Sequence, residues 1–263
     1  MNRIDNKFNE LRAARRKAFI AYVTAGDPDL AVTRKVVLKF EEAGVDIVEL
    51  GIPFSDPIAD GPTIQAASYR ALKGKATLKK IFAMVRSLRA ATDMPLVFMT
   101  YYNPVLRYGL KKFFASCRKC GVDGVIVPDL PCEEASDLIK FARFEKVATI
   151  FLSSPTSTPE RIRDIAKNSK GFIYYVSLTG VTGARRELPK DISSKIRAIR
   201  SFTDKPVAVG FGVSSPNQAA RIARVADGVI VGSAIVKIMG ENKNITPRVY
   251  NFAKSIAKAV HVA

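Results

Sequence analysis

Residues 48–67 read V-E-L-G-I-P-F-S-D-P-I-A-D-G-P-T-I-Q-A-A, an apolar approach that ends in a loop rich in proline, glycine and aspartate. The apolar approach is typical of a buried β-strand, and it brings one carboxylate, Glu49, to the end of that strand. The loop that follows carries Asp56 and Asp60. A carboxylate in an apolar strand is unfavourable to bury unless it is paired or has a chemical role. Because a second carboxylate on a neighbouring loop suits acid–base chemistry with a moving lid, this stretch indicates an enzyme.

The same order of strand and then helix recurs along the chain. Short runs rich in Val, Ile, Phe or Tyr, each bounded by Gly, Pro or Asp, predict eight strands. These runs lie at residues 18–25, 47–52, 96–100, 125–127, 148–152, 172–177, 207–209 and 229–231. Between them, apolar residues at spacings of three and four predict helices, as in residues 78–88.

Eight such units in 263 residues predict an α/β protein of the (β/α)₈ TIM barrel class, with an extra N-terminal helix around residues 4–16. An open, doubly wound parallel sheet is the alternative, and it would need a reversal of strand order. No linker or break in composition interrupts the chain, so we expect a single domain over residues 1–263. In a barrel the active site lies at the carboxyl ends of the strands, which is where Glu49 and its loop fall.

Composition and charge limit the compartment and the partners. No apolar run is long enough to cross a bilayer, the first 16 residues lack the apolar centre of a signal peptide, and three cysteines do not make a disulfide framework. We therefore expect a cytoplasmic protein. The net charge is +18, from 42 Lys and Arg against 24 Asp and Glu. Because the basic residues are spread over several predicted helices, we expect a solvated basic exterior with no nucleic-acid or membrane partner.

Metal and histidine chemistry find little support in the sequence. Cys117 and Cys120 have C-x-x-C spacing, but the only other thiol is Cys132, so a zinc site lacks ligands. We expect this pair to lie on a helix that faces the barrel. The only histidine, His261, is close to a C-terminus that we expect to fray, which argues against Ser-His-Asp catalysis.

Three glycine-bearing segments follow late strands and predict a phosphate site. They are residues 179–183, Gly210-Phe211-Gly212 and Gly232-Ser233. Glycine lets backbone amides approach an anion, and the start of a helix adds N–H donors and a favourable dipole. In (β/α)₈ enzymes the loops after strands seven and eight often hold a substrate phosphate. The alternative is that these glycines only turn the chain.

With these features in place, the chain resembles the alpha subunit family of tryptophan synthase along essentially its whole length. The resemblance is carried by the stretch at residues 48–65, by G-F-I-Y-Y-V-S-L-T-G-V-T-G-A-R at 171–185, by V-G-F-G-V-S-S-P at 209–216 and by V-G-S-A-I-V at 231–236. It implies a TIM-barrel lyase that cleaves indole-3-glycerol phosphate to indole and glyceraldehyde 3-phosphate without a metal or cofactor of its own. It also implies a partner, the beta subunit that carries pyridoxal phosphate, in an α₂β₂ heterotetramer that passes indole between active sites for tryptophan biosynthesis.

The resemblance also assigns roles to single residues. It implies that Glu49 protonates indole C3 and that Asp60 stabilises the cationic ring. The substrate-binding residues that it implies are Tyr22, Tyr101, Tyr174, Thr182, Gly183, Phe211, Gly212, Gly232 and Ser233. Thr182 lies on a loop at residues 179–189 that resembles the closing lid of the family. The residues that it implies at the interface with the beta subunit are Asp56, Pro57, Asn103, Asp129 and Pro131.

Alternatives remain for the carboxylates and for the activity. Glu49 could be a structural carboxylate paired with a buried Lys or Arg, and Asp56 and Asp60 could be turn formers beside Pro and Gly. The chain could also be another phosphosugar enzyme on this scaffold, such as an isomerase, or a non-catalytic binding subunit. A free-standing relative that releases indole without a partner would have the same motifs.

Overall fold

The computed structural model describes residues 2–176, 191–210, 212–241 and 243–263. Each predicted strand is present in it, and the runs of Val, Ile and Phe that predicted the strands are buried. The strands are β1 Ala18–Thr24, β2 Ile47–Gly51, β3 Leu96–Met99, β4 Gly124–Ile126, β5 Ala148–Ile150, β6 Leu152–Ser153, β7 Ile173–Val176, β8 Val207–Gly210 and β9 Gly228–Val231.

These strands form one parallel sheet that closes into a barrel. Within the described residues the order is β5-β4-β3-β2-β1-β9-β8-β7-β6, and the strand pairs are parallel. The two ends of this order, β5 and β6, are separated in sequence by Phe151 alone. They are therefore two halves of one barrel strand, and the predicted (β/α)₈ barrel is confirmed over an open doubly wound sheet.

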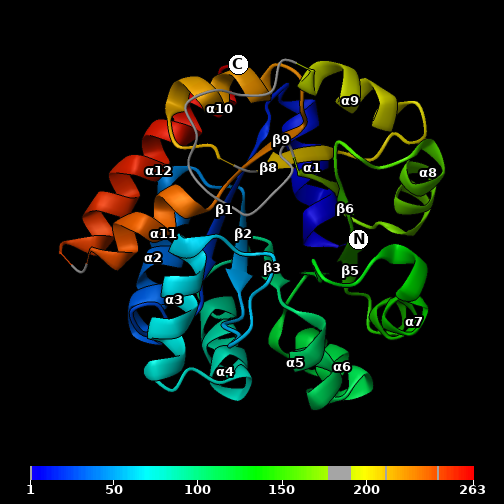
Figure 1. The fold of residues 1–263 in the computed structure, drawn as a ribbon. Coiled ribbons are helices and arrows are strands. Elements are labelled where there is room, and N and C mark those ends of the chain that lie inside the picture. The colour runs from blue at the N-terminus through cyan, green and yellow to red at the C-terminus, as the bar shows by residue number, and fades with distance from the viewer. Residues whose placement is uncertain (1, 177–190, 211, 242) are drawn as a thin grey trace.

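Helices surround the barrel, and apart from the first of them the described helices cover its outside (Figure 1). They are α1 Arg3–Ala13, α2 Leu30–Ala43, α3 Pro62–Lys73, α4 Leu78–Arg89, α5 Tyr102–Tyr108, α6 Leu110–Cys120, α7 Ser136–Phe144, α8 Pro159–Asn168, α9 Ile192–Arg200, α10 Pro216–Ala223, α11 Ser233–Gly240 and α12 Ile245–His261, with a short 3₁₀ helix at Cys132–Glu134. Polar caps set several of the starts: the side chains of Asn2, Asp29 and Thr77 accept from the N–H groups of Ile4, Val32 and Lys80.

Helix α1 differs from the others because it closes the amino-terminal end of the barrel. In Figure 1 it lies inside the ring that the other helices form. Its buried residues Ile4, Phe8 and Leu11 belong to the same apolar cluster as the inward-facing strand residues, and the ring of Phe8 lies 5.8 Å from that of Phe172. The predicted N-terminal extra helix is thus an apolar plug, and it ends at Ala13, earlier than expected.

The expectation that His261 lies on a frayed terminus is wrong. His261 is the last residue of α12, and its Nε2 lies 2.8 Å from Asp46 Oδ2, which also accepts the N–H of Phe19 at 2.8 Å. The C-terminal helix is therefore tied to the barrel by a polar contact that sequence spacing did not reveal.

The expectation for the cysteine pair is confirmed. Cys117 and Cys120 are buried on α6, and all three cysteines are free thiols. In the part of the chain that the structure describes, no helix is long and apolar enough to span a membrane.

Candidate active site

Glu49 lies inside the barrel because of the alternation of side chains along β2. Val48 and Leu50 belong to the apolar cluster beneath the outer helices, whereas Ile47 belongs to the inner cluster. Glu49 stands opposite Tyr22 on β1 and Val97 on β3, and its side chain is fully buried. Among the described residues, neither carboxylate oxygen has a hydrogen-bond partner and no Lys or Arg forms an ion pair with it.

The environment of Glu49 favours its neutral form. Burial raises the pKa of the Glu49 carboxyl from 4.5 to about 8, because the charged form loses its hydration. A structural ion pair would lower that pKa, so the alternative of a paired structural carboxylate has no support in the described residues. Glu49 is a protonated acid at neutral pH.

Asp60 is held at the mouth of the barrel by contacts between its loop and Tyr101. The Tyr101 hydroxyl accepts the N–H of Ala59 at 2.9 Å, and the ring of Phe54 lies 5.4 Å from the ring of Tyr101. Burial raises the pKa of Asp60 to about 6, and a hydrogen bond from Tyr101 partly offsets that shift. Asp60 is therefore mostly ionised at neutral pH. Its backbone N–H donates to the Pro57 carbonyl at 3.1 Å, so the residue also takes part in a turn.

A cavity at the carboxyl ends of the strands brings together most of the predicted catalytic and substrate-binding residues. Its described lining is Tyr22, Ile52, Ala59, Asp60, Ile64, Met99, Thr100, Tyr101, Pro128, Leu152, Tyr174, Gly212, Ile230, Gly232 and Ser233. Glu49 is not on the lining surface, but its charge and that of Asp60 raise the pKa values of Tyr22 and Tyr174, where burial is the larger cause. Both carboxyl groups therefore influence tyrosines that line the cavity.

The apolar walls of the cavity were not predicted. Ile64, Met99 and Leu152 lie at a strand end or in the element that follows one, and this position is the signal that could have identified them. Together with the tyrosines they give the cavity an apolar and aromatic character, which suits a flat aromatic ring better than a free sugar.

Two glycines make room for two of the predicted tyrosines. A Cβ on Gly51 would lie 2.6 Å from Cζ of Tyr22, and a Cβ on Gly210 would lie 2.8 Å from Cζ of Tyr174. Each glycine sits on the strand beside that of its tyrosine, so the ring lies across the neighbouring backbone. Sequence reasoning treated Gly210 as part of a phosphate loop and did not predict this packing role for either glycine.

The predicted phosphate residues that the structure describes, Gly212, Gly232 and Ser233, all line the cavity. Gly232 precedes α11 and Ser233 is its first residue, so the amino end of that helix meets the cavity. Gly212 has a φ of 76°, a conformation that glycine adopts without strain. Thr182, Gly183 and Phe211, with the expected lid at 179–189, lie outside the described residues.

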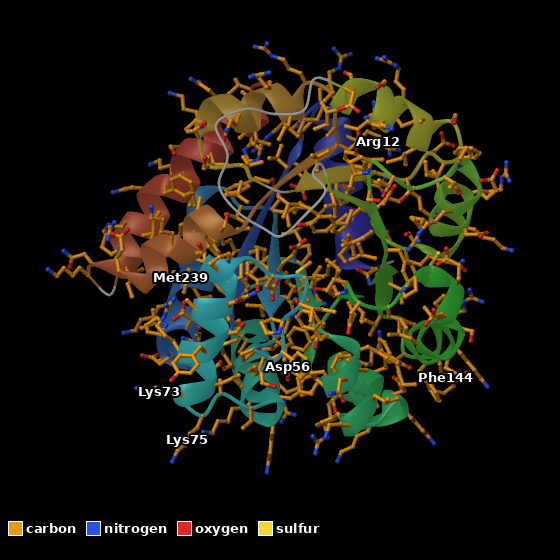
Figure 2. The ribbon with its side chains drawn as sticks, in the orientation of Figure 1. Arg12, Asp56, Lys73, Lys75, Phe144 and Met239 are labelled. Carbon is orange, nitrogen blue, oxygen red and sulfur yellow. The ribbon has the colours of Figure 1, made fainter. Side chains whose placement is uncertain are left out.

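The predicted interface residues follow the carboxyl ends of β2, β3 and β4, four of them on loops and Asn103 on α5. Asp56, Asn103 and Asp129 are exposed, while Pro57 and Pro131 are half-buried. Asp56 lies on the loop between β2 and α3 (Figure 2). Both carboxylate oxygens of Asp129 accept the N–H of Tyr102 at the start of α5, at 2.9 and 3.2 Å. Exposed apolar side chains accompany these residues, with Ile58 78% and Leu106 54% exposed.

Comparison with known families identifies the chain. A sequence model of the family described as "Tryptophan synthase alpha chain" matches residues 8–261. The chain belongs to the tryptophan synthase alpha chain family. A tryptophan synthase alpha chain from Geobacter sulfurreducens is 52% identical over 238 residues, covering 90% of each chain. One from Caldanaerobacter subterraneus subsp. tengcongensis is 48% identical over 244 residues, covering 93% of each.

Solved structures of the same family have the same fold. A structure of Mycobacterium tuberculosis tryptophan synthase matches with a TM-score of 0.93 and 38% identity, covering 100% of this chain and 99% of that one. The Legionella pneumophila tryptophan synthase alpha subunit matches with a TM-score of 0.92 and 35% identity, covering 99% and 98%. The described residues hold no group of three or more His, Cys, Asp or Glu that could bind a metal ion.

Proposed function

We propose that Glu49 and Asp60 are the catalytic acid–base pair of this tryptophan synthase alpha chain. As a member of its family, the protein is a lyase of tryptophan biosynthesis that cleaves indole-3-glycerol phosphate to indole and glyceraldehyde 3-phosphate. The family needs no cofactor for this step, and pyridoxal phosphate belongs to the beta subunit. The observation that carries the proposal is a pair of carboxyl groups at one cavity, Glu49 buried opposite the lining residue Tyr22 and Asp60 on the lining itself. Their pKa values are about 8 and about 6, on opposite sides of neutrality.

Glu49 is protonated at neutral pH, which is the state that the first step of the reaction needs. Cleavage of the bond between indole C3 and the glycerol phosphate chain begins with protonation of C3. A carboxyl group with a pKa of about 8 holds its proton at pH 7 and is a stronger acid than water. Because Glu49 lies on a rigid barrel strand, it can deliver the proton to one fixed position.

Asp60 is ionised at neutral pH, which is the state that the cationic intermediate needs. Protonation of C3 leaves a positive charge shared with the ring nitrogen, and an ionised carboxylate that accepts the ring N–H stabilises this charge. When the C3 bond then breaks, its electron pair returns to the ring and neutralises the nitrogen. The hydroxyl on the leaving carbon becomes the aldehyde, and its proton passes to the Glu49 carboxylate. The enzyme is thereby restored with no net uptake of protons.

The other cavity residues would bind the indole ring and the phosphate group of the substrate. Tyr22, Tyr101 and Tyr174 would contact the indole ring through apolar surface. The phosphate would lie at Gly212, Gly232 and the amino end of α11 at Ser233, where backbone N–H groups and the helix dipole favour an anion. Thr182, Gly183 and Phe211 are proposed here from the family resemblance alone.

The partner of the chain is the tryptophan synthase beta subunit, with which the family forms an α₂β₂ complex. We assign the contact surface to Asp56, Pro57, Asn103, Asp129 and Pro131. Support comes from their position after the carboxyl ends of the strands, where the cavity lies, and from the exposed Ile58 and Leu106 beside them. A partner at this face would cover the entrance through which indole leaves.

Two further predictions accompany this function. A single domain over 1–263 is supported by a single sheet with strands from residue 18 to residue 231 and by a family match over residues 8–261. A cytoplasmic location fits a biosynthetic enzyme with free thiols.

The test is indole release from indole-3-glycerol phosphate by the purified chain, with and without a tryptophan synthase beta subunit. We expect slow release alone and faster release with the partner. Glu49→Gln should abolish release while leaving binding of glycerol 3-phosphate intact, and Asp60→Asn should reduce it strongly. Glu134→Gln, at an exposed position, is the matched control and should be fully active. Full activity of Glu49→Gln would refute the mechanism, and fast release without a partner would indicate a free-standing indole producer.

A further inference from the structure

A wide basic cleft lies at the end of the barrel opposite the active site. It is bounded by the start of α1, the carboxyl ends of α4 and α6, and the segments that lead into β4 and β5. Its volume is about 920 Å³. Its charged lining is Arg3, Arg86, Arg89, Arg118, Lys119 and Lys146 with one carboxylate, Asp123. The cleft therefore carries a marked excess of positive charge.

Two of these arginines, Arg89 and Arg3, already have hydrogen-bond partners within the cleft. Arg89 donates to the carbonyls of Gly121 and Met94 at 2.7 and 2.8 Å, and to Asp123 Oδ2 at 2.7 Å. Arg3 donates to the other oxygen of Asp123 at 3.2 Å. Asp123 is buried, so its charge is compensated by these two residues and does not balance the rest of the cleft.

The remaining four cations have no such partner. Within the described ranges, no carboxylate lies within ion-pair distance of Arg86, Arg118, Lys119 or Lys146, and the contact that Arg86 makes is with Cys120 Sγ at 3.8 Å. A basic residue near the end of a helix is favoured by the helix dipole, which explains each cation singly. It does not explain why cations from α4, α6 and the segment before β5 line one cleft, where they repel each other until an anion binds.

The shape and chemistry of the cleft narrow the choice of anion. Its volume fits a ligand of nucleotide size or smaller. The four cations without a carboxylate partner come from three separate segments, so a ligand that contacts all of them must present negative charge at several points, as linked phosphate groups do. No aromatic side chain lines the cleft in the described part of the chain, so it lacks the stacking surface that single-stranded nucleic acids use.

We propose that this cleft is a binding site for a small anion with two or more linked phosphate groups. It recognises the phosphate chain rather than a base, so inorganic tripolyphosphate and a nucleoside triphosphate share the chemistry. The site is separate from the catalytic cavity and does not depend on the roles of Glu49 and Asp60.

The test is calorimetric titration of the full chain with tripolyphosphate, with glyceraldehyde 3-phosphate present to occupy the active site. Binding should weaken as salt is raised from about 50 to about 200 mM. The double variant Arg118→Gln/Lys119→Gln should bind at least about tenfold more weakly. Lys73→Gln/Lys75→Gln removes the same charge from the outer edge of α3, where Figure 2 shows both side chains, and should bind like the wild type. Titration with ATP distinguishes the two sources, since a preference for ATP indicates a nucleotide.

Amide NMR on the wild-type chain locates the site without any variant. Tripolyphosphate should shift the amide signals of Gly121 and Val122 on the cleft and leave those of Gly232 and Ser233 unchanged. The proposal is overturned if no binding occurs, if both double variants weaken binding equally, or if glyceraldehyde 3-phosphate displaces the ligand. It is also overturned if single-stranded DNA binds as tightly per phosphate, because the surface would then be a non-specific polyanion field.

Discussion

Replacing the buried acid Glu49 by glutamine should stabilise the fold while it abolishes activity. Burial raises the pKa of Glu49 from 4.5 to about 8, so between these pH values the folded state holds a proton that the unfolded state has released. The free energy of unfolding therefore falls as pH rises through this window, by about 1.4 kcal/mol per pH unit. At pH 7 the loss amounts to about 3 kcal/mol, and above pH 8 it levels off near 5 kcal/mol. Glutamine has the same shape and does not ionise, so the variant avoids this loss.

Urea unfolding followed by far-UV circular dichroism measures the effect directly. The wild type and Glu49→Gln should be compared at about pH 5.5, 7 and 8.5, and the advantage of the variant should grow steadily over that range. Glu134→Gln makes the same substitution at an exposed position and is the matched control for the exchange of a carboxyl for an amide group. A difference between the wild type and Glu49→Gln that stays constant from pH 5.5 to 8.5 would refute the burial argument, whatever its size.

Three other predictions follow from the same contacts. The pH profile of kcat/KM should be bell-shaped, with an acid limb near pH 6 from Asp60 and a basic limb near pH 8 from Glu49. A substrate phosphate also titrates near pH 6, so Asp60→Asn is the control: it should remove the acid limb from the residual activity if that limb belongs to Asp60. Gly51→Ala should displace the Tyr22 ring and lower kcat/KM by about a hundredfold, whereas Gly74→Ala, whose Cβ would meet its nearest neighbours at 3.4 Å, should leave steady-state kinetics unchanged. Asp123→Asn should lower the free energy of urea unfolding by about 3 kcal/mol, because Arg3 and Arg89 lose a buried counter-charge; an unchanged midpoint would contradict that role.

The strands and the acid could be predicted because their signals are local. Each barrel strand is a short apolar run between turn residues, and Glu49 stands out as the one carboxylate in such a run. The neutral state of Glu49 also follows from local composition, because an apolar strand provides no counter-charge. The position of Asp60 needed the structure, since its loop is held by Tyr101 from the next βα unit.

Features that join distant segments could not be predicted from spacing. His261 and Asp46 are separated by 215 residues, and only the closed barrel brings α12 beside the start of β2. The basic cleft has the same origin, because Arg3, Arg86 and Lys146 lie on different elements and look dispersed along the chain. The close approach of Tyr22 to Gly51 depends on strand register, which is set by the whole sheet.

The apolar plug formed by α1 has a consequence for the order in which the molecule is assembled. Ile4, Phe8 and Leu11 share their cluster with residues from β1 through to Ile230 on β9, so the surface that receives α1 is complete only when the last strand is in place. Helix α1 is made more than 200 residues before β9 and therefore waits through the synthesis of those residues before it can dock fully. Until then its apolar face is exposed to solvent and to other chains, which makes the N-terminal segment a natural target for chaperones during translation.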